Sequence, residues 1–398
     1  MKRFMLLLPL LSLLSCREEV YEDGEVLWSI TLRGPIEGVP AYHNGVIYVG
    51  SDWNRLFAIE EDGYPILWQR MHGVFLGTPV VWEDGSVVAT DWWGDMYAYS
   101  IRGDLLWEKA EGSWNIHPAM DGEVVVAIHE VDTAITTLEW IDKSGNTIRV
   151  DTFPAGIGDL GRANIVFDTE GNAIVSCVTC DFILRFSRDG RINIRSFSVI
   201  THASTDGEAV YTVSSSSAGT YLIKIEPEWF TFDLIKITDD PDPEDFSFSQ
   251  PIIDSRGRVI VASEKWLYVF TKGLSPLWSY PLSSCRKFSS CRIRMPTPVV
   301  GRSGNVYFAC SSTLIVLSEG GRLLWYRDFS KDTVKVIEGI PADITSLLLT
   351  DNRLIVTSCN GKIYSLYVND TYDYDAPWPM FQANPRRTGK VRVPFNFP

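Results

Sequence analysis

Few residues in this sequence stand at the spacings that catalysis requires. His129-Glu130 begins like the zinc-binding pattern HExxH, but Val131-Asp132-Thr133 follows, so the second histidine is missing. The acidic run at residues 239–245 (DDPDPED) could hold a hard cation, yet it lacks the central glycine of an EF-hand loop. The sequence contains no GxSxG nucleophile elbow and no phosphate-binding GK[ST]. We therefore expect no enzyme activity, no catalytic residues and no metal site.

The cysteines favour disulfide bonds over other chemistry. Apart from Cys16, which is treated below, they are Cys177, Cys180, Cys285, Cys291, Cys310 and Cys359. In an exported protein this even number suggests disulfides, although the pairing does not follow from sequence. Cys177/Cys180 and Cys285/Cys291 are the plausible local pairs. Zinc is the alternative for the CxxC sequence, but no second pair stands at zinc-ribbon spacing.

Residues that could anchor a binding partner occur in groups. Trp and Arg are enriched among the residues that dominate protein interfaces, and Trp can also stack on sugar rings. A basic group around Cys285 and Cys291 is notable because the chain as a whole is acidic. The candidate binding residues are Asp52, Trp53, Asp91, Trp92, Trp93, Trp114, His117, Arg286, Lys287, Arg292 and Arg294. Structural packing of the Trp side chains, and pairing of the basic loop with residues 239–245, are the alternatives that remain open.

A repeated unit positions these residues, and residues 78–107 show it most clearly. Glycine turns such as Asp84-Gly85 separate short apolar runs, a pattern that predicts hairpins. The four β-type runs of the unit are residues 79–82, 86–90, 95–100 and 104–107. Such a four-stranded meander cannot bury both faces alone, so it needs neighbours of the same kind.

The unit recurs about every 40 to 50 residues, which is the signature of propeller blades with four strands each. Its opening strands start at Pro40, Pro79, Pro118, Asn164, His202, Pro251, Pro298 and Ser346. The closing strand of the last unit is missing, while an extra strand at residues 25–28 precedes the first unit. We therefore predict an all-β fold: an eight-bladed β-propeller of four-stranded antiparallel blades, closed by the N-terminal strand joining the last blade.

Strand alternation divides the loops between two rims. If the strands of a blade are called A to D, the A–B and C–D turns share one rim, which we call the turn rim; its turns are short and contain glycine. The B–C and D–A connections share the opposite rim, which we call the loop rim. Its loops are irregular, and irregular loops on a rigid scaffold are where binding usually resides. The candidate binding residues fall on this loop rim.

Three blades carry a motif of an apolar strand, a turn glycine and a closing Trp. They are Leu56-Phe57-Ala58-Ile59 with Gly63 and Trp68, Met96-Tyr97-Ala98-Tyr99 with Gly103 and Trp107, and Leu314-Ile315-Val316-Leu317 with Gly321 and Trp325. The motif resembles the PQQ-like, BamB-type β-propeller repeat of bacterial lipoproteins. That resemblance implies blade-docking roles for Trp28, Trp68, Trp107, Trp278 and Trp325. Blades three to five, with Ile148, Ile194 and Phe232 on the closing strands, should pack less regularly.

The resemblance also bears on the C-terminal tail and on cofactors. Trp378-Pro379-Met380-Phe381 and Arg387-Thr388-Gly389 resemble a terminal signature of PQQ-like propeller proteins. We expect Trp378 and Phe381 to cap the propeller. PQQ-dependent dehydrogenases share the repeat, but they use two adjacent cysteines and a bound calcium. This sequence has no adjacent cysteines, so we expect no cofactor.

The N-terminus predicts export. Residues 1–3 are basic, and residues 4–14 are apolar but too few to span a bilayer, as in a secretory signal. Leu13-Leu14-Ser15-Cys16 resembles the bacterial lipobox, which implies lipid modification of Cys16 and stable membrane attachment. An ordinary signal with an incidental cysteine is the alternative. The expected parts are a signal peptide (1–15), a lipidated linker (16–23), the propeller (24–368) and a tail (369–398).

Composition narrows the choice of partner. The 398-residue chain has 36 Lys and Arg against 50 Asp and Glu, a net charge of −14, whereas nucleic-acid binding needs a basic footprint. We interpret the protein as a non-catalytic, lipid-anchored, monomeric scaffold for protein–protein interaction at the bacterial cell envelope. The resemblance to BamB-type propellers implies a place at the periplasmic face of the outer membrane and a role in outer-membrane protein assembly. A surface carbohydrate- or ligand-binding propeller is the alternative, and a PQQ-dependent oxidoreductase is a second one.

Overall fold

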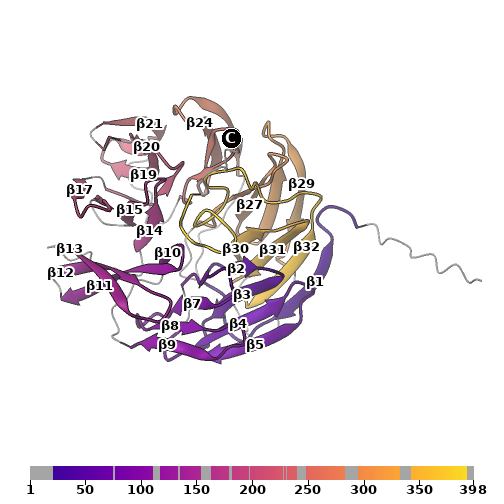
Figure 1. The fold of residues 1–398 in the computed structure, drawn as a ribbon. Coiled ribbons are helices and arrows are strands. Elements are labelled where there is room, and N and C mark those ends of the chain that lie inside the picture. The colour runs from indigo at the N-terminus through magenta and orange to yellow at the C-terminus, as the bar shows by residue number, and fades with distance from the viewer. Residues whose placement is uncertain are drawn as a thin grey trace, which may run out of the picture.

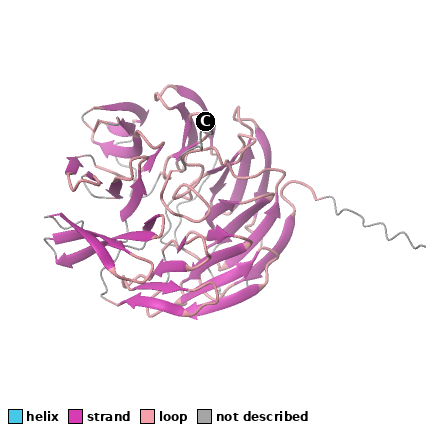
Figure 2. Cartoon of the chain, in the orientation of Figure 1, coloured by secondary structure: helices cyan, strands magenta, loops and turns pink. Residues whose placement is uncertain are grey.

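Eight four-stranded antiparallel sheets surround a central axis in the computed structural model, like the blades of a propeller (Figure 1). The structure describes residues 21–391 except 75–76, 111–116, 133–134, 154–162, 179–181, 197, 227, 230, 240–247, 283–294 and 332–341. Within these ranges every regular element is a strand (Figure 2), and no helix is long and apolar enough to cross a membrane. The predicted all-β, eight-bladed fold is confirmed.

Each blade runs from an innermost to an outermost strand. Blades one to four consist of β2 (Ala41–His43), β3 (Val46–Ser51), β4 (Arg55–Glu60) and β5 (Pro65–Arg70); β6 (Val80–Val81), β7 (Val87–Thr90), β8 (Met96–Tyr99) and β9 (Leu105–Lys109); β10 (Ala119–Asp121), β11 (Val124–Asp132), β12 (Ile135–Ile141) and β13 (Thr147–Phe153); and β14 (Ala163–Phe167), β15 (Ala173–Cys177), β16 (Ile183–Phe186) and β17 (Ile192–Arg195).

Blades five to eight follow the same order. They consist of β18 (Ser204–Thr205), β19 (Val210–Ser216), β20 (Gly219–Ile225) and β21 (Phe232–Thr238); β22 (Ile252–Ile253), β23 (Arg258–Ala262), β24 (Trp266–Thr271) and β25 (Pro276–Pro281); β26 (Val299–Val300), β27 (Val306–Cys310), β28 (Thr313–Leu317) and β29 (Leu323–Asp328); and β30 (Ile344–Leu349), β31 (Arg353–Ser358), β32 (Lys362–Tyr367) and β1 (Val26–Thr31).

The ring closes through its N-terminal strand. β1 pairs antiparallel with β32, so that Ile30 lies opposite Ile363 and Thr31 opposite Lys362. The last blade therefore combines the first and the last strands of the chain, and β1 lies beside β32 in Figure 1. Backbone hydrogen bonds of this strand pair hold the junction together. This closure is the predicted one.

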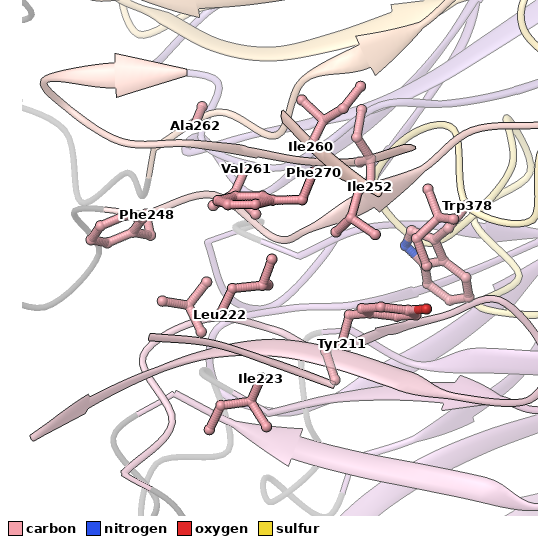
Figure 3. Packing of buried hydrophobic residues seen from close by; sticks show 14 of the residues in the cluster. Tyr211, Leu222, Ile223, Phe248, Ile252, Ile260, Val261, Ala262, Phe270 and Trp378 are labelled. Carbon is pink, nitrogen blue, oxygen red and sulfur yellow. The ribbon is translucent and has the colours of Figure 1, made fainter. Parts of the chain in front are cut away.

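The core lies between the faces of neighbouring blades. Successive residues of a strand point to opposite faces, so a blade between two others buries both sets, and the middle strands β3 and β23 are buried almost throughout. Between blades five and six, Tyr211 and Leu222 lie opposite Ile252 and Phe270 (Figure 3). Trp378 of the C-terminal tail packs in the same cluster, beside Tyr211 (Figure 3).

Tryptophans of the outermost strands contact the next blade at its C–D turn. The indole N–H groups of Trp28, Trp107 and Trp278 donate to the carbonyls of Glu61 (2.8 Å), Lys143 (3.0 Å) and Glu319 (3.0 Å). The rings lie over the turn glycines Gly63, Gly145 and Gly321, where a Cβ would come within 2.8 Å of the ring. Trp325 lies over Gly24 in the same way, whereas the side chain of Trp68 lies outside the described part. The closing tryptophan of one blade and the turn glycine of the next blade therefore pack directly against each other.

Blades three and four make the corresponding hydrogen bond with arginine. Nη2 of Arg149 donates to the carbonyl of Ser187 at 3.0 Å, and Nε of Arg195 donates to that of Trp229 at 2.7 Å. The residues at the expected docking strands, Ile148, Ile194 and Phe232, are exposed instead. Loss of the Trp motif in blades three and four thus changes the donor but keeps a hydrogen bond to the following turn.

Residues 370–391, which we call the axial segment, cover the free edges of the innermost strands. In blades one to four, backbone N–H groups of the innermost strands donate to backbone carbonyls of the segment. The pairs are Tyr42 to Pro385, Val81 to Arg386, Met120 to Thr388 and Phe167 to Gly389. In blades six and seven, the N–H groups of Ile253 and Val300 donate to the carbonyls of Trp378 and Pro379. An unpaired strand edge is open to wrong pairing, and this segment pairs it.

Side chains tie the axial segment to the turn rim. The hydroxyl of Ser255 donates to Asp373 at 2.6 Å, the N–H of Ser303 donates to Asp370 at 3.1 Å, and Lys390 pairs with Asp121. These partners lie in or beside A–B turns. Trp378 and Phe381 are buried, so both pack inside the molecule on the axis rather than face solvent.

Arg387 lies at the centre of the axial segment and is fully buried. Its guanidinium donates to three carbonyls, those of Phe381 (2.5 Å), Pro40 (2.8 Å) and Leu347 (3.3 Å). Burial lowers the pKa of Arg387 to about 9. Because Pro40 precedes blade one and Leu347 belongs to blade eight, this side chain links the axial segment to both sides of the ring closure.

Candidate recognition surface

Three exposed tryptophans occupy the loop rim of blades one and two. Trp53 is 51% exposed in the B–C loop of blade one, and Trp92 and Trp93 are 41% and 65% exposed in that of blade two. Large exposed aromatic side chains at the edge of a rigid ring are typical of recognition surfaces. Of the other candidate binding residues, Trp114, Arg286, Lys287, Arg292 and Arg294 lie outside the described residues.

Trp53 and Trp93 are equivalent in their blades, and each rests on a glycine of the preceding D–A connection. A Cβ on Gly34 would lie 2.2 Å from Cδ1 of Trp53, and a Cβ on Gly73 would lie 2.1 Å from Cδ1 of Trp93. Only glycine therefore allows the two indoles to lie this close to the connection. Backbone hydrogen bonds repeat as well, from Asp52 N to Pro35 O (2.9 Å) and from Trp92 N to Val74 O (2.7 Å).

Asp91 supports the tryptophan loop from inside the protein. It is fully buried, in contrast to its predicted place among the exposed binding residues. Its carboxylate accepts the N–H groups of Gly73 (2.6 Å) and Asp95 (3.1 Å) and the hydroxyl of Tyr97 (3.3 Å). Burial raises the pKa of Asp91, although these N–H donors oppose the shift. A buried carboxylate needs hydrogen-bond donors, and those of Asp91 come from both the D–A connection and the B–C loop, so Asp91 joins the two segments. Asp52, the other predicted aspartate, is half-buried.

His117 is also buried, so the prediction that it lies on the binding surface is wrong. Its Nδ1 lies 3.0 Å from the hydroxyl of Thr78, and its ring contacts those of His202 (5.3 Å between centroids) and Phe381 (5.6 Å). His117 comes just before the innermost strand β10, and that position faces the axis rather than solvent. It packs against the axial segment.

The charged groups beside the two equivalent tryptophans differ. The guanidinium of Arg33 lies 4.7 Å from the ring centroid of Trp53. His72 takes the corresponding place in blade two, but its Nδ1 lies 3.5 Å from Asp95 and 3.6 Å from Glu108. Its ring meets that of Tyr97 edge-on at 5.9 Å. Trp53 of blade one thus has a cation over its ring, while the corresponding histidine of blade two lies beside two carboxylates.

Trp266, at the start of β24 on the same rim of blade six, is a further exposed aromatic residue that sequence reasoning missed (38% exposed). Ser263-Glu264-Lys265-Trp266 has the composition of a polar loop ending in Trp, and this pattern could have revealed it. Arg33 and His72 were missed because only the fold brings the D–A connections next to the B–C loops.

The structure also bears on the predictions about metal ions and disulfide bonds. No group of three or more His, Cys, Asp or Glu side chains that could hold a metal ion occurs among the described residues. Disulfide bonding involves Cys177, Cys310 and Cys359. Cys180, Cys285 and Cys291 lie outside the described part, so the pairs Cys177/Cys180 and Cys285/Cys291 stay predictions.

The blades, the docking tryptophans and the axial segment define the class: an eight-bladed β-propeller of PQQ-like repeats. Residues 18–147 match the family described as outer membrane protein assembly factor BamB, about a third of the chain. A curated relative, outer membrane protein assembly factor BamB of Yersinia pestis, is 31% identical over 111 residues. That match covers 23% of this chain and only 28% of the relative.

Solved structures agree on the fold over most of the chain. BamB from Moraxella catarrhalis has a TM-score of 0.63 at 14% identity and covers 86% of this chain and 97% of its own. The quinohemoprotein alcohol dehydrogenase from Comamonas testosteroni has a TM-score of 0.62 at 11% identity, with 87% and 77% covered. At these identities the likeness shows the fold alone, and an enzyme and an assembly factor share it.

The glycine beneath Trp93 provides a test of this surface. We expect Gly73→Ala to displace the Trp93 indole, because the added Cβ would collide with it, while the backbone of Gly73 is not in the left-handed region. The indole N–H signal of Trp93 should shift in a ¹⁵N-labelled sample. Because the added Cβ would also come within 2.9 Å of the buried Asp91 carboxylate, we expect the free energy of unfolding to fall by about 1 to 2 kcal/mol. Gly320→Ala, where a Cβ meets open space, is the matched control. An unmoved Trp93 signal in Gly73→Ala would contradict the contact.

Proposed function

We propose that this protein is a non-catalytic scaffold that binds other proteins of the bacterial cell envelope through the loop rim of blades one and two. The observation that carries the proposal is the pair of equivalent, exposed tryptophans, Trp53 and Trp93, held on glycines of a closed ring. Rigid aromatic side chains lose little entropy on binding, so they suit a recognition surface better than flexible ones do.

The BamB-type repeat supports a narrower role in outer-membrane protein assembly. We propose that the protein acts there as a monomeric propeller, at the periplasmic face of the outer membrane. The lipobox-like sequence at Cys16 supports attachment through a lipid, since a diacyl anchor gives stable membrane binding. Protein partners, rather than a cofactor, would then occupy the rim.

Removing the aromatic surface should weaken partner binding without unfolding the protein. We expect the double variant Trp92→Ala/Trp93→Ala to lose about tenfold or more in partner capture, the usual effect of truncating interface anchors. Crosslinking in native membranes, with the photoreactive group at Asn54 and identification of the product, measures the capture. The melting temperature should fall by no more than about 4 °C, because Trp92 and Trp93 are 41% and 65% exposed and neither belongs to the hydrophobic core.

Trp266→Ala, an exposed tryptophan on the same rim of blade six, serves as the control and should leave capture unchanged. Unfolding of the double variant would assign the tryptophans to the core and end the proposal. Binding on a glycan array that disappears in the double variant would favour the alternative, a carbohydrate-binding propeller. A rise in melting temperature with PQQ and calcium would favour an oxidoreductase.

A further inference from the structure

The first two blades differ in the charged side chain beside their equivalent tryptophans, and this difference indicates which chemical group of a partner could bind Trp93. In blade one the residue before the supporting glycine is Arg33, and its guanidinium lies over Trp53 at 4.7 Å. A cation over the face of an indole is attracted by the negative charge of the π-system. The protein therefore contains its own example of an arginine bound to a loop-rim tryptophan.

In blade two the same place holds His72, which leaves the face of Trp93 open. Its ring lies against Tyr97 instead, and its Nδ1 faces the carboxylates of Asp95 and Glu108 at 3.5 and 3.6 Å. Among the residues that the structure describes, no cation lies over Trp93, and its side chain is 65% exposed. Trp93 contacts Gly73, while the two carboxylates contact the preceding residue, His72. Two adjacent residues of the D–A connection therefore link the indole to the two carboxylates.

We propose that Trp93, together with Asp95 and Glu108, binds an arginine side chain of a protein partner. Arginine fits better than lysine, because its planar guanidinium stacks on an indole and presents several N–H donors to carboxylates at the same time. The net charge of −14 favours the approach of a basic segment. This inference rests on the proposed function, since it names the chemistry that the loop rim recognises.

The interaction can be measured with a small probe before a partner is known. Indole ¹⁵N–¹H signals of the full-length protein are followed while N-acetyl-arginine amide is added to about 50 mM, a range that detects millimolar binding. The Trp93 signal should shift and approach saturation, and the Trp266 signal should not. N-acetyl-citrulline amide has the same shape without the charge, and it should leave the Trp93 signal in place. Added salt should reduce the arginine effect.

Two substitutions test the assignment of the residues. Glu108→Gln keeps the side-chain shape on the exposed strand β9 and removes one charge, so we expect the arginine probe to bind about 2- to 5-fold more weakly. His72→Arg places an arginine where blade one has Arg33. We expect this side chain to cover Trp93 and to reduce binding of the probe about fivefold or more, with an unchanged melting temperature.

Equal shifts with the arginine and citrulline probes, or no shift with either, would overturn the inference. So would a shift that Glu108→Gln and His72→Arg both leave unchanged. The proposed function is tested separately, by the crosslinking experiment at Asn54. Crosslinking that depends on Trp92 and Trp93, combined with a negative arginine titration, would keep the scaffold role and remove only the arginine.

Discussion

Truncation of the chain before Asp370 is expected to destabilise the whole propeller, and to lower its melting temperature by more than about 10 °C. The axial segment pairs with the innermost strands of blades one to four, six and seven, and it buries Trp378, Met380 and Phe381. Each lost backbone hydrogen bond contributes about 1 kcal/mol, and each buried aromatic side chain contributes more. The sum is comparable with the whole stability of a typical domain.

Thermal unfolding followed by circular dichroism, together with size-exclusion chromatography, measures the outcome. Besides the lower melting temperature, we expect self-association, because the truncation uncovers the inner strand edges. A chain that ends after Val391 keeps the whole axial segment and is the matched control. If the short chain melts within about 2 °C of the control, the axial segment is an addition to a ring that is stable without it.

Replacement of Arg387 by alanine should have the second largest effect, a loss of about 3 kcal/mol in the free energy of unfolding. The change removes three hydrogen bonds, to the carbonyls of Phe381, Pro40 and Leu347, and leaves a cavity on the axis. Burial of an ionised group has its own cost, which the lowered pKa of Arg387, about 9, reflects. The guanidinium nevertheless stabilises the fold, because its removal leaves buried carbonyls without donors.

Two further variants separate the causes. Arg387→Met fills most of the volume but donates no hydrogen bond, so it should lose about 2 kcal/mol if hydrogen bonding dominates. Arg386→Ala changes the neighbouring arginine, which pairs with the exposed Glu83 at 3.5 Å, and should cost less than about 1 kcal/mol. Urea denaturation gives the three free energies. A stability of Arg387→Met equal to that of the native chain would show that the carbonyls do not depend on the guanidinium.

The ring itself could be predicted from the sequence because each blade repeats the same local pattern. Apolar runs and glycine turns identify the strands, and the unmatched strand at residues 25–28 identifies the closure between β1 and β32. Both are local signals that need no knowledge of distant contacts. The docking of Trp28 and Trp107 on the next blade is expected from the resemblance to the PQQ-like repeat, and the structure adds the turn glycine as the surface on which each ring lies.

The rest depends on contacts between distant parts of the chain. Asp91 and His117 are polar residues beside exposed tryptophans in sequence, yet Asp91 is turned inwards to bind Gly73, and His117 faces the axis against Phe381. Burial of a polar side chain is decided by the donors around it, which the sequence does not show. The sequence also does not show that Arg149 and Arg195 take over the hydrogen bond that Trp makes in other blades. Their acceptors are carbonyls in the C–D turn of the next blade, which only the fold brings within reach.

The closure of the ring by β1 also determines how the protein would be held at a membrane. Gly24 takes the place of a C–D turn glycine in blade eight, under Trp325, so the chain enters the propeller on the turn rim. If Cys16 carries the lipid, residues 16–23 form a tether of at most about 27 Å between the bilayer and that rim. The turn rim would then lie towards the bilayer, and the tryptophans of blades one and two, on the opposite rim, would lie towards the aqueous side.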